Sequence, residues 1–179
     1  MKIYTRKGDD GTTGLLYGGR VPKDSPLPTA YGEVDEAQAV LGMARAEAEP
    51  GTELDTLLIA LERDLWVLMA ELAASPDHRD RLVAGTSLVS ESMVTALEAH
   101  IDGVSERFEM PTEFVVPGEN RTAAALDLAR TVVRRAERHA LSAVVDGSQV
   151  VPYLNRLSDL LWALARWQGG VSIIAKGTS

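Results

Sequence analysis

The sequence predicts an all-α protein, built as a bundle of amphipathic helices, on three observations. Apolar residues recur at helical spacing in five stretches, most regularly in the second, where leucines step by four and three residues. Aromatic residues make up only 5% of the chain, which suits helix packing better than sheets. The connections between the five stretches are short, as in helical bundles. The leucines at this spacing in the second stretch are Leu54, Leu58, Leu61, Leu65, Leu68 and Leu72.

Each predicted helix is bounded by turn-forming residues. Residues 1–28 hold eight glycines and prolines and no helical period, so they predict a loop segment before the bundle at 29–167. An extended piece at 113–116 lies between two prolines, and the tail at 168–179 is left open between a short strand and a disordered end. We expect one domain over 1–179, with helices at about 29–49, 54–75, 89–107, 122–145 and 152–167.

Composition excludes several classes of function. The 179 residues include no cysteine, so thiol catalysis, disulfides and thiolate metal sites are excluded. A formal net charge of −8 argues against nucleic-acid partners, which need a basic surface. No signal segment follows Met1 and no apolar stretch suits a membrane span, so a cytoplasmic protein without membrane contact is expected.

The most unusual segment is the glycine-rich run from Tyr4 to Gly14. Glycines in such turns permit close backbone approach, and successive N–H groups can form a nest for an anion. The glycine spacing fits neither the P-loop nor the dinucleotide fingerprint. A flexible polar N-terminus is the alternative. The residues predicted to hold the phosphates of a nucleotide are Thr5, Arg6, Lys7, Gly8, Asp10, Gly11, Thr12, Thr13, Gly14 and Lys23; Asp9 or Asp10 shapes the loop or approaches a phosphate-bound metal.

Three arginines lie along one face of the fourth predicted helix, four residues apart, at Arg130, Arg134 and Arg138. Stacked like charges favour an anionic partner, and guanidinium groups suit phosphate oxygens. Glu137 is placed to orient Arg134. The alternative is a solvated surface face with acidic partners from a neighbouring element.

Polar residues also interrupt the fifth and first predicted helices. Asn155 lies beside an apolar stripe and needs partners if it is buried, whereas Arg156 and Asp159 are spaced to pair with each other. These residues form either a structural network or part of a site. The acids of 33–36 either complement the helix dipole or pair with the arginine helix. No histidine pair has metal-ligand spacing.

Taken together, these segments resemble the PduO-type ATP:cob(I)alamin adenosyltransferases. The matching pieces occur in family order over essentially the whole chain. They are Tyr4–Leu15, Arg20–Lys23, Tyr31–Glu36, Phe114–Gly118, Ala129–Arg138 and Tyr153–Asp159.

The resemblance implies a five-helix bundle, ferritin-like in class, that forms a homotrimer with sites between subunits. It implies transfer of the 5′-deoxyadenosyl group from ATP to cob(I)alamin, with tripolyphosphate leaving and Mg²⁺ bound through the phosphates. Because reduced cobalt is the nucleophile, the protein itself needs none. A reductase or a cobalamin-dependent enzyme is an expected partner.

Residue roles follow from the same resemblance. Arg130 and Arg134 stabilise the leaving group, and Glu137 and Asn155 complete the nucleotide site. Asp35 reaches across the interface to an arginine, Arg130 being favoured. Phe114 lies by the lower face of the corrin and helps to exclude the lower axial ligand.

The chain departs from the family pattern near the expected cobalamin pocket. Lys7 replaces a usual threonine, Glu119-Asn120-Arg121 replaces glycine and small residues, and Asp127 replaces a common histidine. The alternatives are therefore an ATP- or cobalamin-binding bundle without catalysis (a sensor or carrier), an adenosyl or phosphoryl transferase with another acceptor, or an interaction bundle.

Overall fold

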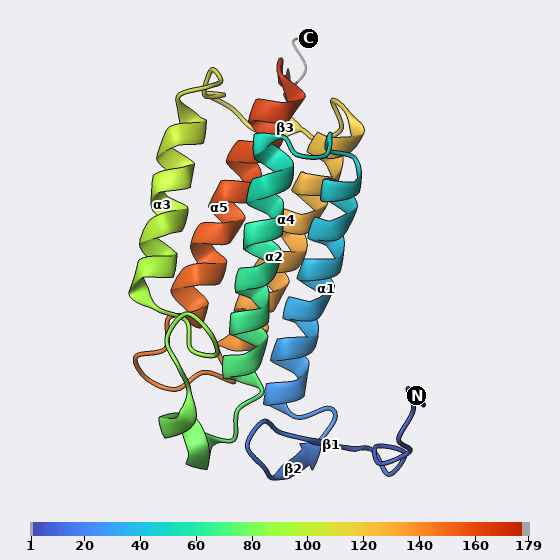
Figure 1. The fold of residues 1–179 in the computed structure, drawn as a ribbon. Coiled ribbons are helices and arrows are strands. Elements are labelled where there is room, and N and C mark those ends of the chain that lie inside the picture. Colours follow the sequence, from blue (N-terminus) through green and yellow to red (C-terminus); the bar gives the residue numbers. More distant parts are fainter. Residues whose placement is uncertain (1, 177–179) are drawn as a thin grey trace.

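The computed structural model describes residues 2–176 and is a bundle of five long helices, as predicted (Figure 1). Helix α4 packs against both α1 and α5, while α2 packs on the outer side of α1 and α3 on that of α5. A short 3₁₀ helix, η1 (Pro76–Arg81), and two two-stranded sheets lie at the ends of the bundle. The helices are α1 (Pro26–Ala46), α2 (Glu53–Leu72), α3 (Glu91–Ser105), α4 (Arg121–Ala140) and α5 (Val150–Gly169).

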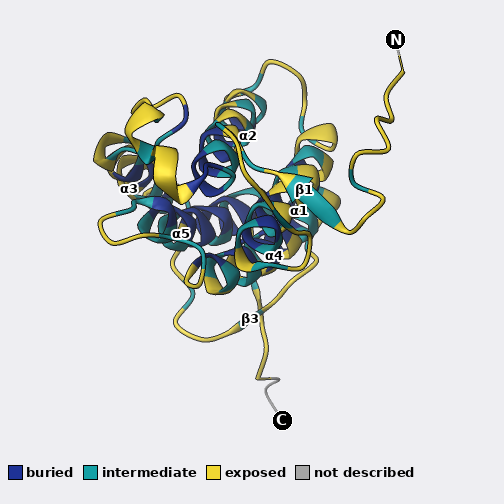
Figure 2. Cartoon of the chain, turned by 90° about the horizontal axis from the view of Figure 1, so that it is seen from below, coloured by how far each residue is buried: buried dark blue, intermediate teal, exposed yellow. Residues whose placement is uncertain are grey.

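The core is made from the apolar stripes that the sequence predicts. The six leucines of the predicted stripe on α2 are buried, and the buried residues face one another between the helices (Figure 2). Burial of one such side chain contributes about 2 kcal/mol relative to exposure. The bundle is therefore held mainly by aliphatic packing.

Helix α1 begins earlier than predicted. We expected Pro26 and Pro28 to belong to the preceding loop, but both lie in the first turn of the helix. Proline is tolerated there because the first helical N–H groups have no partner within the helix, and its φ is already helical. The loop segment is therefore shorter than 1–28.

Helix α4 ends earlier than predicted, at Ala140 rather than near Val145. Ala143 and Val144 both donate their N–H to the carbonyl of Ala140, which tightens the chain into turns. These two residues still pack against the core, so the apolar period outlasts the helix. Periodicity alone therefore overestimated its length.

Two small antiparallel sheets close the ends. Strand β1 (Thr12–Gly14) pairs with β2 (Arg20–Pro22), a hairpin that the sequence analysis did not predict. Strand β3 (Val115–Val116) pairs with β4 (Ile173–Ile174), so this part of the tail is a strand. Residues 177–179 lie outside the described part of the chain.

Candidate active site

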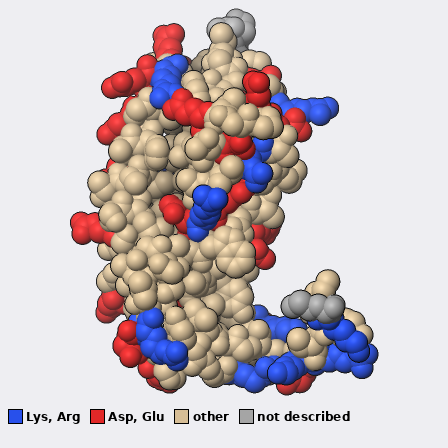
Figure 3. Space-filling model, in the orientation of Figure 1, with Lys and Arg blue, Asp and Glu red and all other residues tan. Residues whose placement is uncertain are grey.

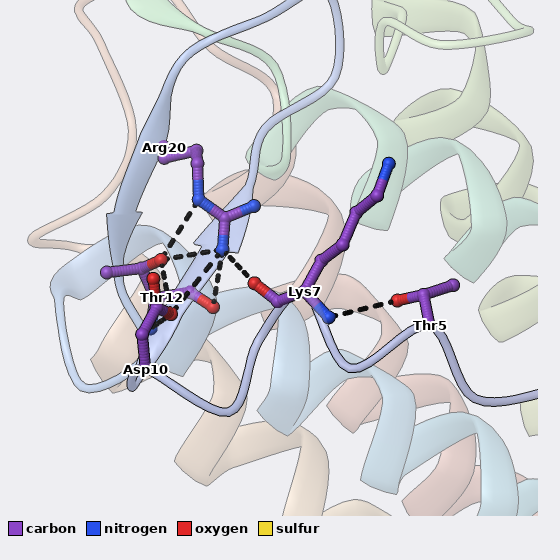
Figure 4. A network of polar contacts seen from close by, with 5 residues as sticks. All are labelled: Thr5, Lys7, Asp10, Thr12 and Arg20. Carbon is purple, nitrogen blue, oxygen red and sulfur yellow. Dashed lines mark hydrogen bonds and ion pairs between the residues drawn. The ribbon is translucent and has the colours of Figure 1, made fainter.

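The glycine-rich loop is ordered by one carboxylate and one guanidinium group (Figure 4). The Oδ1 of Asp10 accepts hydrogen bonds from the backbone N and the Oγ1 of Thr12, at 2.9 and 2.8 Å. The Thr12 N–H lowers the pKa of Asp10, with smaller effects from its hydroxyl and from Arg20. Arg20 donates through Nη2 to the Lys7 carbonyl at 2.5 Å and through Nε to Thr12 Oγ1 at 3.0 Å. Asp10 therefore shapes the loop, and Arg20 is a structural residue that our site prediction missed.

Two positions of the loop require glycine, each for a different physical reason. Gly11 has a φ of +81°, a conformation that side chains rarely adopt. A Cβ on Gly8 would lie 3.1 Å from Nζ of Lys23, so Lys23 lies directly against the loop. The structure thus places Lys23 beside the loop residues with which it was predicted to bind phosphate.

The cations of the loop remain available for a ligand. Among the described residues, Arg20 is the loop cation with a carboxylate within 4.0 Å, at 3.6 Å from Asp10, and Arg6, Lys7 and Lys23 have none. The basic side chains gather on the N-terminal segment, whereas acidic ones are spread over the rest of that face (Figure 3). This segment is where an anion would be attracted.

The arginine helix uses its charges in two ways. Arg134 and Arg138 are exposed, and no carboxylate in the described chain lies within 4.0 Å of either. Arg135, by contrast, donates to Glu33 at 2.5 Å and to Glu36, and these carboxylates raise its pKa well above the ordinary value.

Glu33 and Glu36 therefore pair with the arginine helix, through Arg135. The dipole interpretation is wrong for Glu33, because α1 begins at Pro26 and Glu33 lies beyond its first turn. Asp35 is exposed and free of ion pairs within the described residues.

Asn155 and Glu137 lie together, as expected for members of one site. Asn155 donates through Nδ2 to Glu137 Oε1 at 3.0 Å and accepts from Arg156 Nη1 at 2.6 Å. The predicted pairing of Arg156 with Asp159 is wrong, because Arg156 reaches across to Glu98 on α3 at 2.9 Å instead. Glu137 holds Asn155 rather than Arg134.

The chain also forms a cavity of about 820 Å³ beside Phe114, which we call the Phe114 cavity. Phe114 itself is 90% exposed, and its carbonyl accepts from the Ala175 N–H at 2.7 Å. Sequence reasoning missed three residues of this lining: Trp162, Arg166 and Lys176. Periodicity marks the first two as ordinary members of α5. The cavity lining includes Pro111, Phe114, Val115, Asp127, Arg130, Trp162, Arg166 and Lys176.

The residues that depart from the family pattern have local structural roles. Asn120 caps α4 by accepting from the Ala123 N–H at 2.8 Å. Asp127 pairs with the buried Arg166, and Glu119 lies 3.9 Å from the same guanidinium group. Arg121 lies 4.0 Å from Glu47 at the surface. Of these side chains, Asp127 also lines the Phe114 cavity.

The loop and the Phe114 cavity lie at opposite ends of one chain. Strands β1 and β2 are at the end where α1 begins, whereas β3 is at the other end (Figure 1). Helix α4, with 20 residues, runs between the ends and is about 30 Å long. A single chain therefore does not bring the glycine-rich loop to Phe114.

Residues 2–176 lack two features, one concerning membranes and one concerning metals. No helix in this part of the chain is long and apolar enough to cross a membrane. The same residues form no cluster of three or more histidine, aspartate and glutamate side chains suited to a metal ion.

These features define a class: a helical bundle with a basic, glycine-rich loop at one end and an aromatic-lined cavity with arginines at the other. The family model described as cobalamin adenosyltransferase matches residues 3–168. The chain belongs to this family.

Similar proteins agree with this assignment. A corrinoid adenosyltransferase of Mycobacterium tuberculosis is 41% identical over 174 residues, covering 92% of this chain and 87% of that protein. The corrinoid adenosyltransferase PduO of Salmonella typhimurium is 42% identical over 93% of this chain, which spans only 49% of that longer protein. A variant PduO-type ATP:corrinoid adenosyltransferase from Lactobacillus reuteri, complexed with cobalamin and ATP, superposes with a TM-score of 0.86 at 29% identity, over 99% of this chain and 98% of that one.

Proposed function

We propose that this protein transfers the 5′-deoxyadenosyl group of ATP to cob(I)alamin. The cobalt of the corrin attacks C5′ of ATP, the C5′–O bond breaks, and tripolyphosphate leaves as adenosylcobalamin forms. Family membership is the observation that carries this proposal. The protein needs no nucleophile of its own, so its task is to position two substrates and to neutralise the leaving group.

The glycine-rich loop binds the triphosphate. Asp10 and Arg20 hold the backbone in shape, and the side chains of Arg6, Lys7 and Lys23, which have no carboxylate within 4.0 Å among the described residues, remain to meet phosphate oxygens. The hydroxyl groups of Thr5 and Thr13, and those backbone N–H groups of the loop that do not already donate within it, supply further donors.

The exposed Arg134 and the partly buried Arg130 stabilise tripolyphosphate as its charge develops. Arg134 supports this role because it has no carboxylate within 4.0 Å among the described residues. The hydrogen-bonded pair of Glu137 and Asn155 lies on the facing sides of α4 and α5 and completes the nucleotide site. Arg138 is not assigned to the phosphates, since its Nη1 already donates to the Arg134 carbonyl at 2.9 Å.

Phe114 contacts the lower face of the corrin. An aromatic ring that is 90% exposed beside a cavity of about 820 Å³ supports this role, because burial against a large ligand would remove apolar surface from water. By occupying the lower axial side, the ring favours a cobalt without a lower ligand, which is easier to reduce.

Sites between the subunits of a homotrimer explain the separation of the loop from Phe114. A neighbouring subunit's loop would reach the other end of the bundle, where one chain alone leaves the two parts about 30 Å apart. The exposed Asp35 then pairs across the interface, with Arg130 as the favoured partner.

Magnesium enters with ATP in this proposal. Residues 2–176 contain no cluster of carboxylates that could coordinate Mg²⁺ without ATP. This agrees with the usual coordination of Mg²⁺ by phosphates, waters and one or two carboxylates. The exposed Asp9 is the loop carboxylate that remains for it. When bound, Mg²⁺ supplies positive charge to the phosphates. A reductase supplying cob(I)alamin and a cytoplasmic location remain predictions.

The test is an anaerobic assay with chemically reduced cobalamin, ATP and Mg²⁺, following the corrin absorbance. Protein-dependent formation of adenosylcobalamin with one tripolyphosphate per turnover supports the proposal. ADP as product would mean phosphoryl transfer instead. ATP binding without either product would leave a binding protein, the sensor or carrier considered from the sequence.

A further inference from the structure

Arg166, on α5, is the largest of the fully buried side chains in the described chain. It is only 1% exposed and lines the Phe114 cavity. Its guanidinium carbon lies 6.0 Å from the ring centroid of Trp162. A buried charge of this kind requires a close opposite charge, because desolvation is costly.

Asp127 supplies that charge from α4. Its Oδ2 accepts a hydrogen bond from Arg166 Nη2, and its side chain is 7% exposed. The second oxygen, Oδ1, lies 3.6 Å from Nε of Arg130, one helical turn further along α4. One carboxylate therefore faces two guanidinium groups, one buried and one at the cavity.

The Asp127 carboxylate attracts Arg130 electrostatically but does not accept a hydrogen bond from it. A separation of 3.6 Å is too long for a hydrogen bond, and Arg130 Nε is buried without a hydrogen-bond partner within residues 2–176. Asp127 is the one carboxylate within 4.0 Å of Arg130 among residues 2–176, so Arg130 keeps donors for a ligand.

We propose that Asp127 is a positioning residue: anchored by Arg166, it fixes the direction in which Arg130 presents its guanidinium group to the Phe114 cavity. The proposal rests on the proposed function, since Arg130 is there a group that stabilises the leaving tripolyphosphate. Asp127 and Arg166 act through Arg130 and need not touch a substrate.

The test is a double-mutant cycle with Asp127→Asn and Arg130→Lys. Asp127→Asn alone lowers kcat about tenfold, the scale of one charge-assisted hydrogen bond from Arg130 to the leaving group. The KM for ATP stays within about twofold. In the Arg130→Lys protein, adding Asp127→Asn lowers kcat by less than about twofold. Asp102→Asn, the same change on the exposed face of α3, leaves both constants unchanged. Tenfold losses in both backgrounds, or full activity of Asp127→Asn, would overturn the proposal.

Two measurements keep this test independent of folding and of the reaction. The double variant Asp127→Asn with Arg166→Gln removes both buried charges, and it should fold while showing the same loss in kcat. The Nε–H signal of Arg130 in ¹H–¹⁵N spectra should shift in Asp127→Asn and stay unchanged in Asp102→Asn. An unmoved signal would reject the positioning role even if the protein formed no adenosylcobalamin, whereas a missing product in the wild-type protein would reject the proposed function alone.

Discussion

Replacing Arg20 with lysine should weaken ATP binding while leaving the bundle intact. Lysine keeps the positive charge, but it replaces the planar guanidinium group with one nitrogen on a flexible stem, so the Nε bond to Thr12 Oγ1 and the fixed direction of the other bonds are lost. The hydrogen bonding that joins Lys7 to Thr12 is therefore weakened, whereas the loop cations that would meet the phosphates are unchanged.

The size of the effect follows from the bonds lost. Arg20 donates to Lys7 O at 2.5 Å, to Thr12 Oγ1 at 2.6 and 3.0 Å, and to Thr12 O at 3.2 Å. Lysine, with three N–H donors on one nitrogen, retains about two of these four bonds. Loss of two net hydrogen bonds at about 1 kcal/mol each raises the free energy of the ordered loop by about 2 kcal/mol. ATP must supply that ordering free energy, so its Kd rises roughly thirtyfold.

Isothermal titration calorimetry with ATP and Mg²⁺, without cobalamin, measures this Kd. The melting temperature should move by less than about 2 °C, because the Arg20 side chain is 45% exposed and lies outside the core. Arg63→Lys, an exposed exchange on α2, is the matched control and should leave Kd unchanged. An unchanged Kd for Arg20→Lys would refute the loop-ordering argument, and an equal loss in Arg63→Lys would show that the fork geometry is not the cause.

Four further substitutions test other parts of the structure. Arg134→Ala should lower kcat/KM about tenfold to a hundredfold, because one charged contact to the leaving group is lost, with little change in melting temperature. Phe114→Ala should slow adenosylation of cob(I)alamin about tenfold or more while the 90% exposed site leaves stability unchanged. Glu71→Gln should cost about 3 kcal/mol in denaturant unfolding, since this 1% exposed carboxylate accepts from Arg79, Ser148 and the Val89 N–H at 2.6–2.8 Å. Asp64→Asn should stabilise the protein more at pH 8 than at pH 4, measured by thermal melting.

The sign of the last prediction comes from burial. Desolvation raises the pKa of Asp64 above its unfolded value, while the hydrogen bond from Tyr153 at 2.9 Å partly opposes this. The protonated acid is therefore favoured in the folded state, and its stabilising effect is complete below the unfolded pKa and lost as pH rises through the folded pKa. Asparagine accepts the same hydrogen bond and does not ionise. Equal gains at both pH values would contradict this reasoning.

The other three substitutions have equally direct refutations. Turnover within twofold for Arg134→Ala would remove its leaving-group role. Parent rates with base-on cobalamin in Phe114→Ala would remove the axial-ligand role. For Glu71→Gln, a cost no larger than that of the exposed Glu49→Gln would show that the three donors are satisfied in another way.

Local patterns in the sequence were sufficient for the helices and for the residues of the loop. Six leucines of α2 recur at helical period and are buried, so this element could be predicted without tertiary information. The glycines of 4–23 predicted turns, and a positive φ occurs at Gly11, whereas anion binding by this segment stays a prediction. Such features depend on residues close together in the chain.

Pairings between distant residues could not be predicted in this way. Arg156 had a suitable acid three residues away, yet it bonds Glu98 on another helix. Glu33 suited a helix dipole, yet it pairs with Arg135, which lies 102 residues later in the chain. A local partner and a distant one have similar electrostatic free energy, so packing decides between them.

By itself, the sequence determined the helical class and the order of the five long helices, because periodicity and turn residues act over a few positions. Only the tertiary structure decided that Arg166 is buried against Asp127, that the tail pairs with β3, and that the loop and Phe114 lie at opposite ends of the bundle. The physical reason is that a buried charge and a shared strand register depend on which helix faces converge, and that convergence is a property of the whole packed bundle.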